Sequence, residues 1–311
     1  MDKTWELIKR LERPHARVDA VLDTDAYNEV DDQFAIAYLL RAGDRVDIKA
    51  FYAAPFYAAF NPRSSDPEDG MVKSYEEIQK IVRLSGREDM LPSIFPGSRR
   101  FLPDENTPVS SEAARDLARR AMEYTQDAPL YVLCIGAITN VASALLIQPA
   151  IRERIVIVWL GGHAFHWPDN FDFNMMQDLA AARVIMNSGA AVVQLPCSGV
   201  VDALKTTGPE LKEWLKEKNA LCDYLCENTV LEAEQYASGK PWSRVIWDIS
   251  AVAWLVDWEG KMVWDKLIPA PIPEYDYQYG HSFLRHPIRQ VWKVERDAIF
   301  EDLFTRLAWK E

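Results

Sequence analysis

Short, nearly continuous apolar runs alternate with amphipathic stretches, and this alternation constrains the fold more than any other feature of the chain. Five runs are rich in β-branched or other apolar residues, at 18–23, 46–53, 129–136, 154–162 and 190–197. Three of them are nearly continuous in hydrophobicity, as is typical of parallel strands that are covered on both faces. Helical patterns lie between the runs, at 32–42, 73–85, 110–125, 139–147 and 179–188. The sequence therefore predicts a doubly wound α/β fold, with a mainly parallel central sheet and helices on both faces.

The last third of the chain predicts a helical C-terminal part. Helical patterns cover 209–236, 248–256 and 296–307, whereas the Pro- and Tyr-rich segment 267–280 is irregular or short-stranded. Earlier in the chain, Thr139 fits a helix N-cap and Ser188-Gly189 fits a helix stop. No segment has the length and composition of a flexible linker, so we expect a single domain over residues 1–311.

Four aspartates lie at the first junction between a strand and a helix. Asp23 and Asp25 close the first apolar run, and Asp31 and Asp32 open the helical segment that follows it. Helix capping and the helix dipole account for one or two of these carboxylates but not well for four. Ligands of open α/β sheets bind beyond the carboxyl ends of the strands, and clustered carboxylates suit a divalent cation. The spacing favours a metal or catalytic site over a solvated capping cluster.

The net charge and the spacing of the cysteines limit the kinds of partner and the cellular compartment that we expect for this protein. The formal net charge of -12 argues against a nucleic-acid or anionic-membrane partner, which would need a basic surface. No apolar run approaches the length of a membrane span, and the first residues do not read as a secretion signal. The four cysteines show no paired CxxC spacing. We therefore expect a cytoplasmic protein with reduced thiols.

Four pieces of the chain resemble the nucleoside hydrolases, the inosine–uridine and purine-specific N-ribohydrolases. The Asp-rich segment 23–32 is similar to the family's DxDxGxDD, and "CIGAITNVASAL" (134–145) is similar to its GPLTNxAxAL. The segment 155–189, with "GGHAFHWPDNFDFN", resembles the IxxMGGAF…EFN block, and "WDISAVAWLV" (247–256) resembles [HW]DxxAVAYL. The pieces occur in the family's order. The resemblance implies a nucleoside hydrolase-like fold and a hydrolase of N-glycosidic bonds of ribonucleosides.

The resemblance also implies a role for individual residues. Asp25, Asp32, Asp248 and the backbone carbonyl of Thr139 would hold Ca²⁺, with Mg²⁺ as an alternative. Asp25 would act as the general base toward the metal-bound water that attacks the anomeric carbon, through an oxocarbenium-like transition state. The implied substrate contacts are Asp31, His166, Asp172, Asn174 and Trp247. Asp23 would support the cluster from behind, and the family tends to form homodimers or homotetramers.

Three departures from the family pattern bear on this hypothesis. The segment from Asp25 to Asp31 is two residues longer than the family's DPGxD, so that Asn28 or Glu29 is a candidate extra or replacement ligand. The sugar-binding Asn after the family's second strand is missing, and Asn61 is a candidate substitute. Asp172 replaces a Glu that is one methylene longer.

Position 247 indicates how the leaving group is handled. The inosine–uridine branch has a His there that can protonate the base, whereas this chain has Trp247, as the purine-specific branch does. Trp247 would stack on a purine or, alternatively, only pack against the helix after it. The aromatic residues Tyr52, Phe56, Tyr57 and Phe60 are candidates for an opposite stacking face. His163 has no assigned role, and packing in the core is an equal alternative for both His163 and His166.

Three other functions compete with a purine nucleoside hydrolase. The altered metal loop favours hydrolysis of another ribosyl or glycosyl compound of carbohydrate metabolism. A non-catalytic protein that binds a metal and a sugar on the same fold is the second alternative. The third is a phosphatase of the haloacid dehalogenase type, since "DTD" follows a strand, but Tyr27 and the rest of the sequence offer no matching set of residues.

Overall fold

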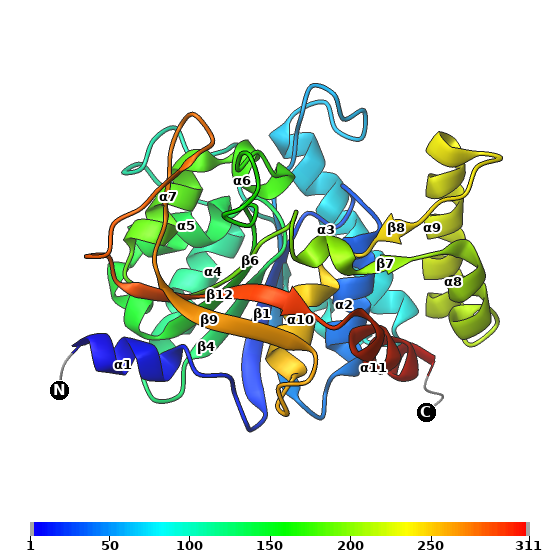
Figure 1. Cartoon of the computed structure of the whole chain (residues 1–311), viewed down its shortest axis with the longest axis horizontal. Coiled ribbons are helices and arrows are strands. Elements are labelled where there is room, and N and C mark those ends of the chain that lie inside the picture. Colours follow the sequence, from blue (N-terminus) through cyan, green and yellow to red (C-terminus); the bar gives the residue numbers. More distant parts are fainter. Residues whose placement is uncertain (1–2, 309–311) are drawn as a thin grey trace.

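An eight-stranded sheet runs through the middle of the computed structural model, which describes residues 3–308 (Figure 1). The strand order is β3-β2-β1-β4-β5-β6-β12-β9. Its first seven strands are parallel to their neighbours, and only β9 runs antiparallel, against β12. The strands of this sheet are β1 (Val18–Thr24), β2 (Val46–Ala53), β3 (Ile94–Phe95), β4 (Leu130–Cys134), β5 (Ile155–Leu160), β6 (Ala191–Leu195), β9 (Val263–Pro269) and β12 (Pro287–Val294).

Two apolar cores cover the two faces of the sheet. Neighbouring residues of one strand enter different cores: Leu22 packs with one group of helices and Val21 with the other. The first core is covered by α1 (Lys3–Arg10), α2 (Asp31–Arg41), α3 (Pro67–Leu84), α8 (Gly208–Leu215), α9 (Ala220–Ala237), α10 (Ile249–Val256) and α11 (Arg296–Ala308). The second is covered by α4 (Glu112–Arg120), α5 (Thr139–Ile147), α6 (Phe173–Gln177) and α7 (Leu179–Asn187). Burial on both faces explains why the strands are apolar throughout, and the predicted fold class is confirmed.

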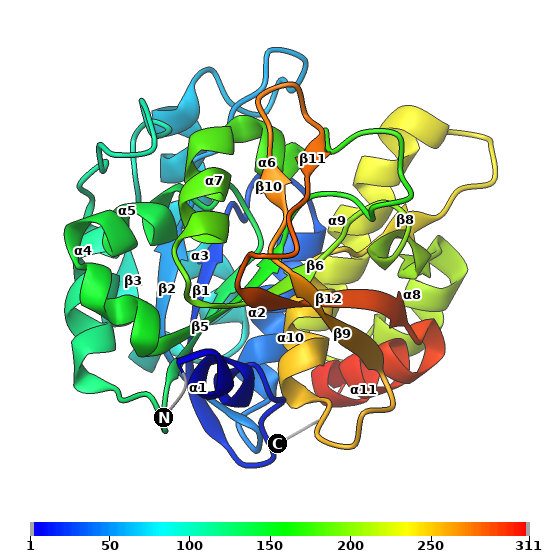
Figure 2. The same cartoon turned by 60° about the vertical axis from the view of Figure 1, so that its left-hand side comes forward.

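The C-terminal part contains more strand than the sequence predicts. The helices α8 to α11 occur, but β12 and β9 extend the main sheet beyond β6. Strand β9 forms the edge and is largely exposed, and β12 is half-exposed, so polar and apolar residues mix in both. Four more short strands are β10 (Ile272–Pro273), β11 (Tyr279–Gly280), β7 (Lys205–Thr206) and β8 (Arg244–Val245), paired as β10–β11 and β7–β8. The β10–β11 hairpin rises beside α6 and α7 (Figure 2).

Helix α5 begins differently from the sequence prediction. Thr139 is its first residue and not its N-cap; the residue before it is Ile138, and no side chain caps the helix. The hydroxyl of Thr139 donates instead to Asp178, 2.6 Å away. The predicted stop at Ser188-Gly189 is confirmed, with Gly189 at a φ of 73°.

Two further expectations concern the cysteines and membrane spans. Cys134, Cys197, Cys222 and Cys226 are all free thiols in the structure. Among residues 3–308, no helix combines the length and the apolar character that crossing a bilayer requires.

Candidate active site

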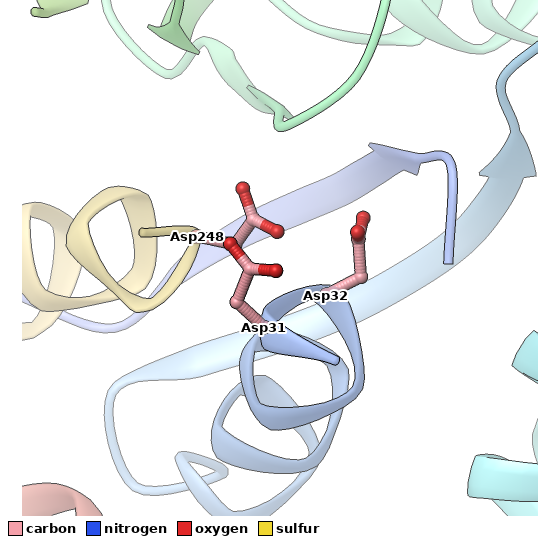
Figure 3. A group of neighbouring side chains, drawn as sticks. All are labelled: Asp31, Asp32 and Asp248. Carbon is pink, nitrogen blue, oxygen red and sulfur yellow. The ribbon is translucent and has the colours of Figure 1, made fainter. Parts of the chain in front are cut away.

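Three carboxylates from opposite ends of the chain meet at the carboxyl edge of the sheet. Asp31 and Asp32 open α2, and Asp248 immediately precedes α10, which packs alongside α2. One oxygen of each residue lies within 4.8 Å of the others, and all three side chains are buried (Figure 3). Carboxylate oxygens in this arrangement are typical ligands of a hard divalent cation. The cluster is consistent with a metal site, but it contains Asp31, whereas the resemblance implies Asp25 as the ligand beside Asp32 and Asp248.

Asp25 lies beside this cluster, on the turn between β1 and α2. Its Oδ1 is so close to Gly136 that a Cβ on that glycine would lie 2.7 Å from it. The longer loop folds back on itself, because the amide of Asn28 donates to the Asp25 carbonyl at 2.7 Å. Glycine at position 136 therefore allows the segment after β4 to approach the carboxylate of Asp25 closely.

Two buried carboxylate oxygens in this group make no hydrogen bond to the residues that the structure describes. They are Oδ2 of Asp25 and Oδ1 of Asp31. The nearest cation to the latter is the guanidinium of Arg244, 3.9 Å away. A buried anionic oxygen without a partner is costly, and a bound cation is the usual compensation. The donor set therefore fits Ca²⁺ or Mg²⁺.

Burial dominates the electrostatics of the cluster. It raises the pKa of Asp31 to about 7, with the neighbouring Glu29 adding to the effect. Burial also raises the pKa values of Asp25, Asp32 and Asp248 well above the ordinary value, and repulsion among the carboxylates raises them further. Without a counter-charge, the cluster holds protons near neutral pH.

Asp23 and Thr139 lie behind the cluster and not on the wall of the cavity. Asp23 accepts a hydrogen bond from Nδ2 of Asn140 at 2.8 Å, and burial raises its pKa to about 7. Asn140 also accepts hydrogen bonds from the backbone and hydroxyl of Ser98. Asp23 therefore lies where a supporting residue is expected, since it connects β1 to the helix that starts at Thr139.

A cavity of about 380 Å³ opens over the carboxylates, which is enough for a small ligand. Its inner wall contains Asp25, Asn28, Glu29, Asp31, Asp32 and Asp248. The remaining wall is formed by Ile135, Leu160, His163, Phe171, Asp172, Phe173, Asn174, Cys197, Ser198 and Trp247. The segments after β1, β5 and β6 thus enclose one space at the carboxyl edge of the sheet, as is general for this architecture.

Asp172 and Asn174 shape the far wall through the start of α6. Oδ2 of Asp172 accepts from the amide of Gly162 at 2.5 Å, and Oδ1 accepts from the amide of Asn174 at 3.0 Å. Nδ2 of Asn174 donates to the carbonyls of Ile135 and Leu160. No hydrogen bond to the described residues uses the amide oxygen of Asn174. Of Asp172 and Asn174, it is therefore Asn174 that offers a ligand a polar atom without an existing partner.

Trp247 lines the cavity and also packs against the apolar core. Its backbone amide donates to Oδ2 of Asp31 at 3.2 Å, which ties position 247 to the carboxylate cluster. The two functions considered for Trp247, stacking on a ligand and packing, are therefore compatible in this structure.

The two histidines of the segment after β5 have different surroundings. His166 is exposed, lies against Gly199 and is not among the residues lining the cavity. His163 is buried and lines it. Sequence reasoning had assigned a ligand contact to His166 and none to His163. The sequence alone does not tell which of the two histidines faces inward.

The aromatic stretch after β2 does not line the cavity. Tyr52 is buried and donates to Asp116, and the exposed Phe60 packs edge-on against Phe173. The aromatic residues that do line the cavity beside Trp247 are Phe171 and Phe173. Asn61, considered as a substitute sugar ligand, donates to Oδ1 of Asn28 at 2.7 Å and so supports the loop after β1.

A half-buried ion-pair network borders the cavity on the side of the longer loop. Arg244 pairs with Glu29 at 2.6 Å and lies 3.8 Å from Glu232 of α9. Arg63 pairs with the other oxygen of Glu232 and donates to the carbonyl of Tyr27. Through Tyr27 and Glu29, the longer loop is therefore connected to α9 and β8.

A doubly wound α/β chain with a buried carboxylate cluster at the carboxyl edge of its sheet is the kind of protein in which a metal-assisted hydrolase site is expected. The model of the inosine-uridine preferring nucleoside hydrolase family matches residues 65–298 of this chain. The chain therefore belongs to that family. No curated protein sequence is similar enough to match.

Solved structures share the fold at low sequence identity. A plant nucleoside hydrolase, PpNRh1, is 17% identical with a TM-score of 0.74, over 94% of this chain and 99% of that one. A purine-preferring ribonucleoside hydrolase from Gardnerella vaginalis is 18% identical with a TM-score of 0.70, over 93% and 98%. The effector protein XOO4466 is 16% identical with a TM-score of 0.65, over 98% and 97%. These similarities establish the fold over nearly the whole chain.

Proposed function

We propose that this protein is a Ca²⁺-dependent hydrolase of the N-glycosidic bond of ribonucleosides, with purine nucleosides as the preferred class. The observation that carries the proposal is the convergence of Asp25, Asp31, Asp32 and Asp248 in one cavity, with two of their buried oxygens lacking a hydrogen-bond partner. Membership of the nucleoside hydrolase family supports the reaction class. The name of the purine-preferring relative supports the base class.

The inner wall of the cavity is assigned to the cation and the ribose. Asp25, Asp32 and Asp248 of this wall would hold the ion, and the carbonyl of Thr139, which is not on the wall, is kept as a proposed fourth ligand. When bound, the ion lowers the pKa of water and orients the sugar hydroxyls. Asp25 accepts the proton of the attacking water, because its free Oδ2 is a buried base without a competing donor. Asp31 accepts a hydrogen bond from a ribose hydroxyl. The negative charge of this wall stabilises the ribosyl cation that develops as the bond breaks.

The outer wall is assigned to the two ends of the substrate. Trp247 stacks on the base, which stabilises the complex by about 1–3 kcal/mol. Asn174 contacts the 5′ side of the sugar, and Asp172 acts beside it while it caps α6. We keep His166 as a proposed contact that requires the exposed segment after His163 to fold over the bound substrate. Glu29 and Asn28 support the cluster, together with Asp23.

A substrate panel with and without chelator tests the proposal. Purified protein is assayed with inosine, guanosine, adenosine and 4-nitrophenyl riboside, in Ca²⁺ and in EDTA. We expect release of the purine base from at least one nucleoside in Ca²⁺ and a loss of at least 100-fold in EDTA. The variant Asp32→Asn, which lacks one proposed cation ligand, is the control that should be inactive. Turnover that is unaffected by EDTA after dialysis would refute the metal assignment.

Two alternatives correspond to other outcomes of the same panel. Cleavage of the nitrophenyl riboside alone would favour another ribosyl or glycosyl compound as the natural substrate, and the longer loop beside Glu29 motivates that alternative. Binding of ribose and Ca²⁺ without any turnover would favour a non-catalytic relative. A homodimer or homotetramer in the cytoplasm is proposed by analogy with the family, and light scattering on the purified protein tests the assembly.

A further inference from the structure

His163 is a feature of this cavity that the proposed roles leave unused. His163 follows Gly161 and Gly162, at the position where the family pattern GGAF has an Ala. The side chain is 8% exposed and lines the cavity together with Phe171, Ser198 and Trp247. A polar ring in such a place is either satisfied by the protein or available to a ligand.

The backbone around His163 is held on both sides. Gly162 has a φ of 78°, a conformation that glycine adopts without strain, and it turns the chain between Gly161 and His163. The amide of His163 donates to Oδ1 of Asn170 at 2.7 Å. The segments after β5 and β6 are joined by two backbone hydrogen bonds, from Cys197 to Gly162 and from Ala164 to Ser198. The position of the ring is therefore set before any ligand binds.

One ring nitrogen of His163 is occupied and the other is available. The amide of Ser198 donates to Nδ1 at 3.2 Å, so Nδ1 is an acceptor and the neutral ring carries its hydrogen on Nε2. No described residue forms a hydrogen bond with Nε2. Burial lowers the pKa of His163, although the carboxylates of Asp169 and Asp202 oppose this effect. His163, a residue of the cavity wall, thus carries an Nε2–H donor that no described residue uses, and Trp167 packs edge-on against its ring.

We propose that the Nε2–H of His163 donates a hydrogen bond to the leaving base of the substrate. The inference rests on the proposed function, because it assumes that ribose occupies the carboxylate-lined inner wall (Figure 3). It also takes the base to lie against the part of the lining that His163 and Trp247 form. Trp247 stands where the inosine–uridine branch has a His, so the chain lacks that acid.

Cleavage of the bond does not require a proton from His163. The bond between C1′ and the base nitrogen breaks, and its electron pair goes to the base. The attacking water adds its oxygen to C1′ and gives a proton to Asp25. Negative charge develops on the base, which takes its proton from solvent, and the Nε2–H dipole stabilises that charge while keeping its own hydrogen.

The test compares a purine base, whose negative charge the hydrogen bond would stabilise, with nitrophenolate, which is stable as an anion without it. His163→Ala is expected to lower kcat for purine nucleosides by about 10- to 100-fold, with a small change in KM. Its kcat for 4-nitrophenyl riboside is expected to stay within about twofold, because nitrophenolate is stable as an anion. His163→Gln places an amide N–H near the former Nε2 and should recover part of the loss, whereas His163→Asn should not. His15→Ala removes an exposed histidine and is the control.

A second readout is independent of turnover. Long-range ¹H–¹⁵N NMR of the free protein identifies the protonated nitrogen, and we expect Nε2–H for His163. A ring protonated on Nδ1, or an Ala variant that slows both substrates equally or neither, overturns the inference. If the wild-type protein cleaves no nucleoside, the proposed function fails and the inference fails with it. Wild-type turnover with an unselective His163→Ala variant overturns the inference alone.

Discussion

The substitution Asp248→Asn separates two effects of the carboxylate cluster on the free energy of unfolding. One is the stabilisation by a bound cation, and the other is the repulsion between neighbouring carboxylates. The cluster gathers oxygens of Asp31, Asp32 and Asp248 within 4.8 Å. At that separation, two ionised carboxylates repel by about 3–4 kcal/mol with an effective dielectric constant near 20. This value is an upper limit, because the cluster without a cation takes up protons near neutral pH and so relieves part of the repulsion. Asparagine has the same shape as aspartate, so the substitution removes one charge and leaves the packing of α10 against α2 unchanged.

The expected size of the effect follows from linkage. A cation present at 100 times its Kd adds about 2.7 kcal/mol to the free energy of unfolding. For 311 residues, the unfolding entropy is about 0.65 kcal/mol/K, so the cation should raise Tm by about 4 °C. Asp248→Asn should lose this rise. In EDTA its own Tm should equal or exceed that of the wild type by up to about 5 °C, because the repulsion is relieved.

Differential scanning calorimetry in Ca²⁺ and in EDTA measures both quantities. Asp127→Asn is the matched control, since it removes one negative charge from an exposed pair with Lys9 and should keep the full rise. A wild-type Tm that does not respond to Ca²⁺, or an equal rise in Asp248→Asn, would refute the assignment of the cluster to a cation. A Tm in EDTA that falls by several degrees in the variant would refute the repulsion argument.

Three further predictions test other parts of the site. Trp247→Ala should raise KM for purine nucleosides by about 5- to 100-fold through lost stacking, and an unchanged KM in steady-state kinetics would leave Trp247 as a packing residue. Arg244→Ala should lower the free energy of unfolding by about 1 kcal/mol in urea titrations, because Glu29 loses its cation partner while Glu232 keeps Arg63; an unchanged value contradicts this. Burial raises the pKa of Asp172 to about 6 from an ordinary value near 3.8, so its stabilising contribution is full below pH 4 and is lost as the pH rises through 6. Relative to Asp172→Asn, the wild type should therefore lose about 2.4 kcal/mol between pH 4 and pH 7, and a difference in unfolding free energy that is independent of pH would refute the shift.

The central fold could be predicted because burial on both faces leaves a clear pattern. Val132 and Leu133 enter opposite cores, so β4 must be apolar at every position and stands out in the sequence. Strand β9 has a partner on one side only and exposes Lys266 and Leu267, so its composition resembles a loop. The missed strands are thus those whose position in the sheet relaxes the demand for apolar residues.

The carboxylate cluster was predictable for a related reason, and His163 was not. Four aspartates at one junction are costly enough to signal a ligand, and the motif at 247–256 supplied Asp248. Which of His163 and His166 faces the cavity depends on the positive φ of Gly162 and on the hydrogen bond from Ser198. Both features come from tertiary structure and leave no periodic pattern in the sequence.

The longer loop after β1 alters the part of the cavity wall around Asn28 and Glu29 more than it alters the carboxylate cluster. Asn28 is held by Asn61, and Glu29 is directed to Arg244. Asp25 and Asp31 nevertheless both reach the cavity. The additional residues therefore find partners outside the carboxylate cluster. Substrate choice is the property that should differ, because Glu29, although paired with Arg244, adds a carboxylate to a cavity wall that already contains Asp25, Asp31, Asp32 and Asp248. A nucleoside that carries a phosphate should for this reason be disfavoured relative to the neutral nucleoside, which a direct comparison of kcat/KM for inosine and its 5′-monophosphate would measure; equal values would contradict the argument.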